Sequence, residues 1–250
     1  MWLCRKDGIV SSGKLTTVNE MQPGRRHPLD EAKLREFEKD VTEESFWLHL
    51  RYAWPFTVCG LHALYNYYSA IRYVESQKIG GDIVECGVFL GGSAMFAAKY
   101  MNELNSTRPL RVFDSFYGFT ENNPELDRNY DGKVVCNPNK PEYEFEDKAV
   151  ANMRDAGYEY LEIVKGDIFT TLPRHTMTSI AVLRLDTDTY ETTKFELEQL
   201  YDKVSPGGVV IIDDYGFNKG CALAVENFIA DKNVFLCRFD RFGRSFVKPF

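Results

Sequence analysis

Two apolar runs near the centre of the chain each end in a pair of acids. The first run is followed by Asp186 and Asp188, and the second, residues 209–212, by Asp213 and Asp214. The amphipathic stretch between the runs predicts a helix, and the Ser-Pro-Gly-Gly stretch 205–208 after it predicts a sharp turn. The runs are therefore expected to be parallel neighbouring strands joined by a crossover. Ligands of open parallel sheets bind beyond the carboxyl ends of the strands. The four carboxylates are therefore expected to converge on a ligand.

Carboxylates that meet without a counter-charge repel one another and raise one another's pKa values. A hard divalent cation would remove that cost, and both Mg²⁺ and Ca²⁺ prefer oxygen ligands. The acids that follow residues 180–185 and 209–212 therefore predict a cation site.

Earlier strands of the same pattern must position these acids. Runs 82–86, 110–113 and 160–164 are expected to be strands that alternate with helices, which predicts a doubly wound α/β sheet. These strands too end in acids, namely Glu85, Asp114 and Asp167. The last 17 or so residues favour two strands around a turn at 241–244.

The turn after the first of these strands is rich in glycine. Gly87, Gly91 and Gly92 would let the backbone approach a ligand and let a helix begin close to the sheet. The spacing is not that of a pyrophosphate-binding turn. Asp114 is placed to accept hydrogen bonds from a ribose diol. Asp167 would accept from an adenine amino group, or would cap a helix or turn.

The first 78 residues are expected to lie outside the sheet, as an N-terminal arm and a helical cap or lid, with the catalytic domain over 79–250. Residues 1–29 lack periodicity, Asp30 predicts a helix over 31–41, and a longer helix is expected over 57–77. The cap covers one sheet face, acts as a lid, or forms a homodimer contact. It holds more aromatic side chains than one face needs: Phe46, Trp47, Tyr52, Trp54 and Phe56.

Composition narrows the class of protein. The chain has 250 residues, a formal net charge of -7 and 27% charged residues, which argues against a nucleic-acid partner. No apolar run approaches the ~20 residues needed to cross a bilayer, and the start lacks the apolar core of a signal peptide. A cytoplasmic protein without a membrane partner is expected. The six scattered cysteines are interpreted as reduced, mostly buried thiols.

Several motifs carry a family resemblance: GDIVECGVFLGGS (81–93), VFDSFYGF (112–119), GDIFTTLP (166–173), VLRLDTDTYETT (182–193) and LYDKVSPGGVVIIDDYG (200–216). The segment from 81 to about 228 resembles the macrocin O-methyltransferase (TylF-like) family, whose members methylate sugar hydroxyls with S-adenosyl-L-methionine. The resemblance implies a class I methyltransferase fold, Rossmann-like, with a seven-stranded, mostly parallel sheet and an antiparallel last hairpin.

The resemblance also implies roles for individual residues. Asp186, Asp213 and Asp214 are similar to the family's Mg²⁺ ligands, and Asp188 to its proposed general base. A cation that binds a hydroxyl lowers its pKa, and a nearby carboxylate then takes the proton. The residues expected to bind S-adenosylmethionine are Glu85, Cys86, Gly87, Gly91, Ser93, Asp114, Ser115, Gly166, Asp167 and Asp186.

The acceptor is expected to be a small molecule with a sugar or sugar-nucleotide-like hydroxyl. The N-terminal region and the loop 120–142 depart from the family pattern, so particular antibiotic substrates are not carried over. Two alternatives stay open: a metal-dependent glycosyltransferase that uses Asp186-x-Asp188, and a non-catalytic binding module with a methyltransferase fold. The glycosyltransferase hypothesis leaves the glycine turn unexplained. A non-catalytic module would usually have lost some of the acids, whereas all of them are present. The aromatic cap predicts a homodimer or higher homo-oligomer.

Overall fold

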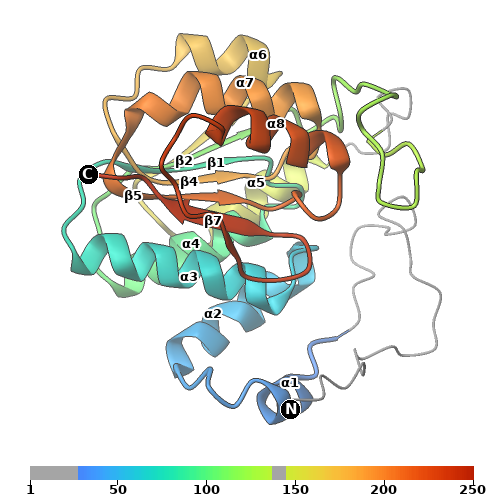
Figure 1. Ribbon diagram of the computed structural model, residues 1–250. Helices are drawn as coiled ribbons and strands as arrows, with labels where there is room; N and C mark the ends of the chain where they lie inside the picture. Colours follow the sequence, from blue (N-terminus) through green and yellow to red (C-terminus); the bar gives the residue numbers. More distant parts are fainter. Residues whose placement is uncertain (1–27, 137–144) are drawn as a thin grey trace.

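The computed structural model describes residues 28–136 and 145–250, so almost all of the predicted arm and part of the long loop lie outside the described residues. A seven-stranded sheet with the order β3-β2-β1-β4-β5-β7-β6 forms the centre (Figure 1). The strands are β1 Asp82–Cys86, β2 Leu110–Asp114, β3 Leu161–Lys165, β4 Ile180–Leu185, β5 Val204–Ile212, β6 Cys237–Arg238 and β7 Arg244–Val247.

The first five strands are parallel, and β7 pairs antiparallel with both β5 and β6. This order and the antiparallel last hairpin confirm the predicted class I methyltransferase fold. Because the sheet order turns at β1 and β4, the carboxyl ends of these two strands mark the switch point where ligands bind in such sheets.

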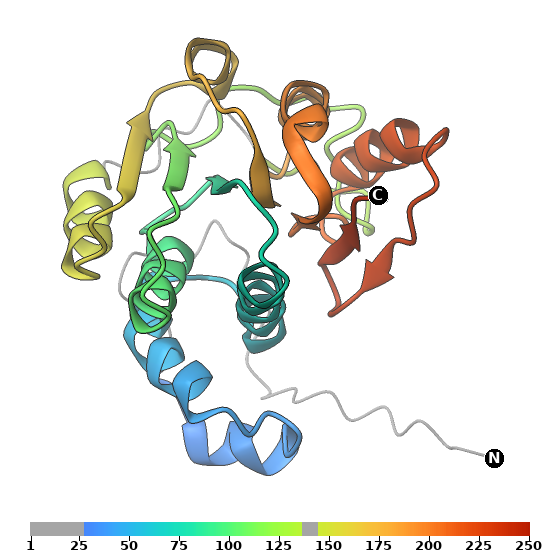
Figure 2. The same ribbon diagram turned by 90° about the vertical axis from the view of Figure 1, so that its left-hand side faces the viewer.

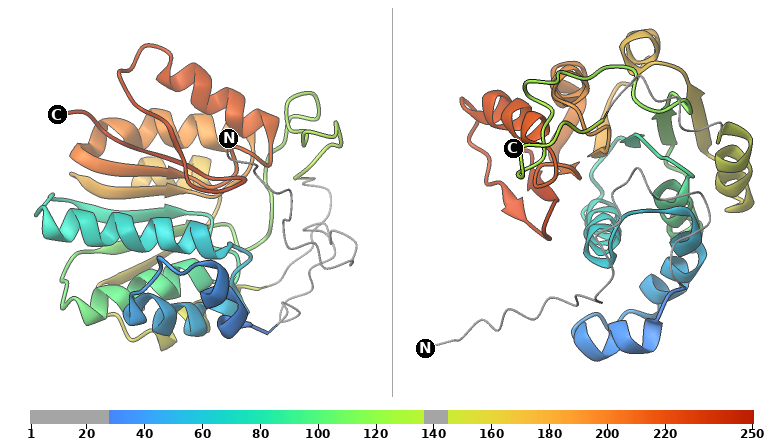
Figure 3. Two further views of the ribbon diagram at one scale, coloured as in Figure 1. Left: turned by 60° about the horizontal axis from the view of Figure 1, so that its bottom comes forward. Right: turned by 90° about the vertical axis from the view of Figure 1, so that its right-hand side faces the viewer.

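Helices cover both faces of the sheet, which is seen edge-on in Figure 2. One face carries α2 Glu44–Ala53, α3 Leu61–Ser76, α4 Gly92–Glu103 and α5 Glu146–Asp155, and the other α6 Ile168–Thr171, α7 Tyr190–Leu200 and α8 Lys219–Ile229. The helix α1 Glu31–Phe37 lies beside α2 and away from the sheet (Figure 3). Short 3-10 helices cover Trp54–Phe56, Leu172–Arg174 and Tyr201–Lys203. Among the described residues, none of the helices has the length and apolar character that crossing a membrane requires.

Alternation along the strands divides the core between the two faces. Val209 and Ile211 of β5 join the core that contains α3 and α4, whereas Val210 and Ile212 join the core under α7 and α8. The strand β4 is buried along its whole length. This is the pattern expected of a central strand in a parallel sheet covered on both faces.

The helices before the sheet share its core. Phe46 and Trp47 of α2 and Tyr67 of α3 have no exposed surface, and they lie in one cluster with Ile83 of β1 and Val112 of β2. The expectation that Phe46 and Trp47 belong to a surplus aromatic surface is therefore wrong, because the cluster over α4 absorbs them. Tyr52 is exposed, as expected, and Trp54 and Phe56 are partly buried.

Several element boundaries differ from the prediction. The helix expected over 31–41 ends at Phe37. The helix expected from residue 57 begins at Leu61, because Gly60 is extended and Pro55 lies in the separate 3-10 turn. The Ser-Pro-Gly-Gly stretch 205–208, expected to be a sharp turn, is a bulge inside β5: Ile180 pairs with Val204, but Val182 pairs with Val209.

The described cysteines agree with the expectation of reduced, mostly buried thiols. Cys59, Cys86, Cys136 and Cys221 are buried, Cys237 is exposed, and all five are reduced cysteines. Cys4 lies outside the described residues.

Candidate active site

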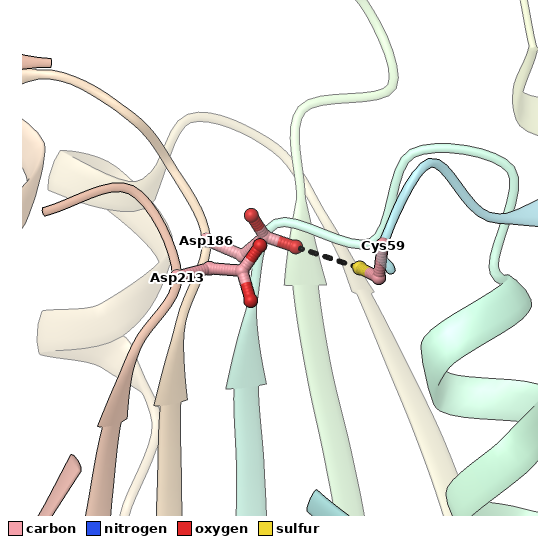
Figure 4. A group of neighbouring side chains, drawn as sticks. All are labelled: Cys59, Asp186 and Asp213. Carbon is pink, nitrogen blue, oxygen red and sulfur yellow. Dashed lines mark hydrogen bonds between the residues drawn. The ribbon is translucent and has the colours of Figure 1, made fainter. Parts of the chain in front are cut away.

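The ends of β4 and β5 bring Asp186 and Asp213 together, as the sequence predicted. One ligand atom of each lies within 4.8 Å of the other and of the Cys59 sulfur (Figure 4). Cys59 comes from the connection that precedes α3, and its Sγ lies 3.9 Å from Asp186 Oδ2. Burial raises the pKa of the Cys59 thiol, so this side chain faces the acids as a neutral donor.

A buried arginine stands among these groups. Arg184 is 1% exposed, and its Nη1 donates to Glu85 Oε1 at 2.8 Å and to Asp186 Oδ2 at 2.7 Å. Its Nη2 donates to Asp213 Oδ1 at 2.9 Å and to Cys59 Sγ at 3.1 Å. Arg184 and Glu85 are register partners in β4 and β1, so their side chains point to the same face. The positive charge of Arg184 therefore offsets part of the negative charge of the acids. The sequence predicted that a metal ion would offset all of it.

Sequence reasoning missed Arg184, although a signal was present. An arginine inside an otherwise apolar strand is costly to bury unless carboxylates pair with it. The stretch 180–188 thus contains both the buried arginine and one of the acids that pair with it, Asp186.

Asp188 and Asp214 form a second acid pair beside the first. The Asp188 amide donates to Asp214 Oδ2 at 3.2 Å, and the two side chains are hydrogen-bonded. Burial, followed by the charge of Asp186, raises the pKa of Asp188 to about 8. Burial, followed by the charge of Asp188, raises the pKa of Asp214 well above its usual value. At neutral pH this pair therefore holds a proton.

Asp213 of the first pair has a raised pKa for a similar reason. Burial, followed by the charge of Asp186, raises the pKa of Asp213 to about 7, against the lowering effect of Arg184. Two hard oxygen donors that lie within 4.8 Å of each other offer a place where a divalent cation can bind in exchange for a proton. Asp186 and Asp213 fit a Mg²⁺ ion on these grounds. Asp214 is turned to Asp188, so its part as a third ligand stays a prediction.

Asp188 is not the residue that caps the helix after it. The N-cap of α7 is Thr189, whose side chain accepts from the Thr192 amide. Asp188 instead has a positive φ of 66°, a conformation that costs a non-glycine residue about 1–2 kcal/mol. Such strain concentrates at functional sites, where neighbouring contacts enforce it.

Backbone hydrogen bonds connect the segments at the edge of the sheet where the cofactor-binding residues were predicted. The Gly87 amide donates to Phe113 O, the Gly166 amide to Asp114 O, and the Asp186 amide to Cys86 O. Asp114 accepts from the amides of Val88 (2.7 Å) and Phe89 (3.1 Å) with Oδ2 and from Phe116 (2.7 Å) with Oδ1. These bonds place Gly87, Asp114, Gly166 and Asp186 side by side.

Glycine is required in the β1 turn by the chain itself. A Cβ atom at Gly87, where φ is +84°, would lie 2.0 Å from the carbonyl oxygen of Asp186. A Cβ atom at Gly91, where φ is +82°, would lie 2.5 Å from Met153 Cγ. These glycines therefore allow the close approach of other parts of the protein, namely the residue after β4 and helix α5. The sequence predicted the approach of a ligand instead.

Other predicted cofactor residues have partners within the protein. Glu85 and Cys86 have no exposed surface, and the buried Ser93 hydrogen-bonds Glu85. Ser115 Oγ donates to the Gly118 carbonyl. Asp167 caps α6 by accepting from the Phe169 amide at 2.9 Å, which is the capping alternative. Contacts of these residues with a cofactor stay predictions.

Comparison with known proteins decides the family. The family model described as Macrocin-O-methyltransferase (TylF) matches residues 18–244. The chain belongs to this family. The macrocin O-methyltransferase family consists of S-adenosylmethionine-dependent enzymes, so the protein is an S-adenosylmethionine-dependent O-methyltransferase. The predicted class of enzyme is confirmed, and neither the glycosyltransferase nor the binding-module alternative stands.

Relatives and solved structures agree with the family. The 8-demethyl-8-(2,3-dimethoxy-alpha-L-rhamnosyl)-tetracenomycin-C 4'-O-methyltransferase of Streptomyces olivaceus is 32% identical over 187 residues, 70% of this methyltransferase and 69% of that chain. The demethyldecarbamoylnovobiocin O-methyltransferase of Streptomyces niveus is 31% identical over 183 residues, 71% and 70% of the two chains. The structure of the O-methyltransferase NovP superposes with a TM-score of 0.69 at 30% identity, over 78% of this chain and 83% of that one.

Proposed function

We propose that this methyltransferase transfers the methyl group of S-adenosylmethionine to a hydroxyl of a sugar, in a glycoside or a sugar nucleotide, with Mg²⁺ as the metal cofactor. Relatives with similar sequences are named as methyltransferases of a rhamnosyl tetracenomycin, of demethyldecarbamoylnovobiocin and of mycinamicin III. The observation that supports the proposal is the meeting of Asp186 and Asp213, with ligand atoms within 4.8 Å of each other, beside the bonded pair Asp188 and Asp214 at the ends of β4 and β5.

Asp188 is the proposed general base. Its pKa of about 8 suits a group that must take a proton near neutral pH, because a base is most effective when its pKa lies close to the working pH. Deprotonated Asp188 removes the hydroxyl proton as the oxygen attacks the methyl carbon in line. The O–CH₃ bond forms while the S–CH₃ bond breaks, and the bonding electrons stay on the sulfur of S-adenosylhomocysteine.

Asp186 and Asp213 would hold the Mg²⁺ ion, and Asp214 is the predicted third ligand. A bound cation lowers the pKa of the acceptor hydroxyl and fixes its position. Arg184 keeps both ligands in place, since it donates to one oxygen of each at 2.7 and 2.9 Å. The other oxygen of each carboxylate would be its ligand atom for the ion.

Methyl transfer to a panel of paired acceptors tests the proposal. Labelled S-adenosylmethionine is incubated with rhamnosides, dTDP-deoxysugars and the aglycones without their sugars, each with Mg²⁺ and with EDTA. We expect label only in the sugar-bearing compounds, and recovery of EDTA-treated enzyme on addition of Mg²⁺. Methylation of the aglycones would overturn the sugar assignment, and full activity in EDTA would overturn the metal assignment.

A further inference from the structure

Asp127 is a buried carboxylate that the proposed mechanism does not use. It lies in the loop 116–136 and has no exposed surface. Its Oδ1 accepts from the Tyr190 amide at 2.8 Å and from Asn218 Nδ2 at 3.0 Å, and its Oδ2 accepts from the Asn123 amide at 2.6 Å. Tyr190 is the first residue of α7, and Asn218 is the N-cap of α8. Asp127 therefore sits between the positive ends of two helices, each of 11 residues.

Asn218 connects Asp127 to the proposed base. The Asn218 side chain is fully buried, and its Nδ2 donates both to Asp127 Oδ1 and to the Asp188 carbonyl at 2.9 Å. Its Oδ1 accepts from the Gly220 amide at 2.8 Å, which caps α8. The amide thus uses both of its N–H groups in a bridge that runs from the loop to the backbone of Asp188.

Asp188 needs such support because of its backbone. Its φ of 66° is disfavoured for a residue other than glycine. Its amide is held by Asp214 at 3.2 Å and its carbonyl by Asn218 at 2.9 Å. The direction of a side chain follows from the backbone conformation of its own residue. The bond from Asn218 therefore helps to aim the Asp188 carboxylate toward Asp214.

Contact with the start of α7, through the Tyr190 amide, accounts for only part of the bonding of Asp127. Thr189 already caps α7 and Asn218 already caps α8. The loop is in addition closed against α8 by the Lys219 amide, which donates to Arg128 O at 2.9 Å. The fit around the carboxylate is close: a Cβ atom at Gly220 would lie 2.2 Å from Asp127 Oδ1. The remaining role of Asp127 is to connect the loop, through Asn218, to the backbone of Asp188.

We propose that Asp127 and Asn218 are positioning residues: Asp127 orients the Asn218 amide, and Asn218 holds the backbone of Asp188 in its working conformation. The inference rests on the proposed function of Asp188 as the base. It predicts that a substitution at Asn218 lowers the rate of methyl transfer without weakening cofactor binding.

Two substitutions that keep the cap of α8 isolate the bridge. Asn218→Ser keeps a capping oxygen but loses the amide donors, and Asn218→Asp keeps the shape but turns an oxygen toward Asp127 and the Asp188 carbonyl. Asn102→Ala is the control. Asn102 lies near the C-terminal end of α4, and the substitution deletes the hydrogen bond from its side-chain amide to the Ala156 carbonyl. S-adenosylhomocysteine binding is measured by calorimetry, amide hydrogen exchange by NMR, and kcat with an acceptor that the wild type methylates.

We expect both Asn218 variants to exchange the Asp188 and Tyr190 amides faster, to bind S-adenosylhomocysteine within about twofold of the wild type, and to lose roughly tenfold or more in kcat. Asn102→Ala should change none of these. Unchanged exchange at Asp188 in Asn218→Ser overturns the proposal, with or without a known acceptor. Wild-type kcat in that variant also overturns it. A wild-type enzyme that methylates none of the acceptors counts against the proposed function, whereas the exchange result still decides the bridge.

Discussion

At the scale of single residues, Arg184 changes the electrostatics of the site. The acids after β4 and β5 do not stand unpaired, since the guanidinium bonds Asp186, Asp213 and Glu85. Removal of one partner of such a buried group leaves the other charge without compensation, which is strongly destabilising. The acids that Arg184 does not touch, Asp188 and Asp214, are left to each other and retain a proton.

Asp188→Asn separates the proposed base from the proposed metal ligands. The amide cannot take a proton, so we expect the methylation rate to fall ~10²-fold or more while S-adenosylhomocysteine and Mg²⁺ still bind. Asp213→Asn is the contrasting variant, because excess Mg²⁺ should partly restore its activity. Rates over a range of Mg²⁺ concentrations compare the two. Asp188→Asn that turns over at the wild-type rate would rule out its role as the base.

Glu196 supplies a prediction about pH. It has no exposed surface, its Oε2 accepts from Thr187 Oγ1 at 3.0 Å, and among the described residues its Oε1 has no partner. Burial, followed by the charge of Asp186, raises its pKa to about 8. Between about pH 4.3, the pKa of an unfolded glutamate, and pH 8, the folded state therefore binds more protons than the unfolded state. The free energy of unfolding then falls as the pH rises.

Glutamine at position 196 does not titrate, so Glu196→Gln should gain stability relative to the wild type as the pH rises from 5 to 8. The slope of this difference is at most about 1.4 kcal/mol per pH unit. Urea unfolding of both proteins at pH 5, 6.5 and 8 measures it. A difference that stays constant across this range would show that Glu196 is ionised in the folded protein.

At the scale of elements, the β1 turn fixes the geometry between strands. Gly87→Ala would place a methyl group 2.0 Å from the Asp186 carbonyl oxygen and would push the turn away from β4. Gly157→Ala is the control, since Gly157 also has a positive φ, of 68°, but has nothing within 4 Å. Both variants should melt at a lower temperature, and only Gly87→Ala should weaken S-adenosylhomocysteine binding, by about tenfold or more. Equal binding by the two variants would mean that the turn does not shape the cofactor site.

The elements were largely predictable because each has a local signal. The apolar run 180–185 is β4 with the predicted bounds, and Asp30 caps α1 as expected. The stretch 205–208 was misread because its Pro-Gly-Gly sequence is typical of turns, whereas pairing with the C-terminal segment keeps it in the sheet. That pairing is a long-range contact, which local sequence does not encode.

The site was predictable in its acids but not in its connections. Asp186 and Asp213 meet because strand topology dictates it. The choice of Asp214 as a partner for Asp188, and the contribution of Cys59 from before α3, depend on how distant segments pack. Asp127 lies in a loop without periodicity, and only the structure shows that it is buried between two helices.

At the scale of the whole molecule, the outer surface of the first helices bears on assembly. Phe37, Leu48 and Tyr52 of α1 and α2 are 59%, 42% and 48% exposed. Exposed apolar side chains of this size favour an interface, so we expect a homodimer formed through α1 and α2. Leu48→Asp should then give a monomer by light scattering, while Leu223→Asp on α8 should not. A monomeric wild type would end this expectation.

The shared core of α2, α3 and the sheet has a consequence during synthesis. Residues 44–76 leave the ribosome before any strand, yet Tyr67 and its neighbours are covered by residues as late as Val209 and Ile211. At about 5–20 residues per second, their aromatic side chains stay uncovered for on the order of ten seconds. Nascent chains are therefore most open to aggregation and to chaperone binding in this interval. Slower elongation after residue 76 lengthens the exposure without changing a contact of the folded protein.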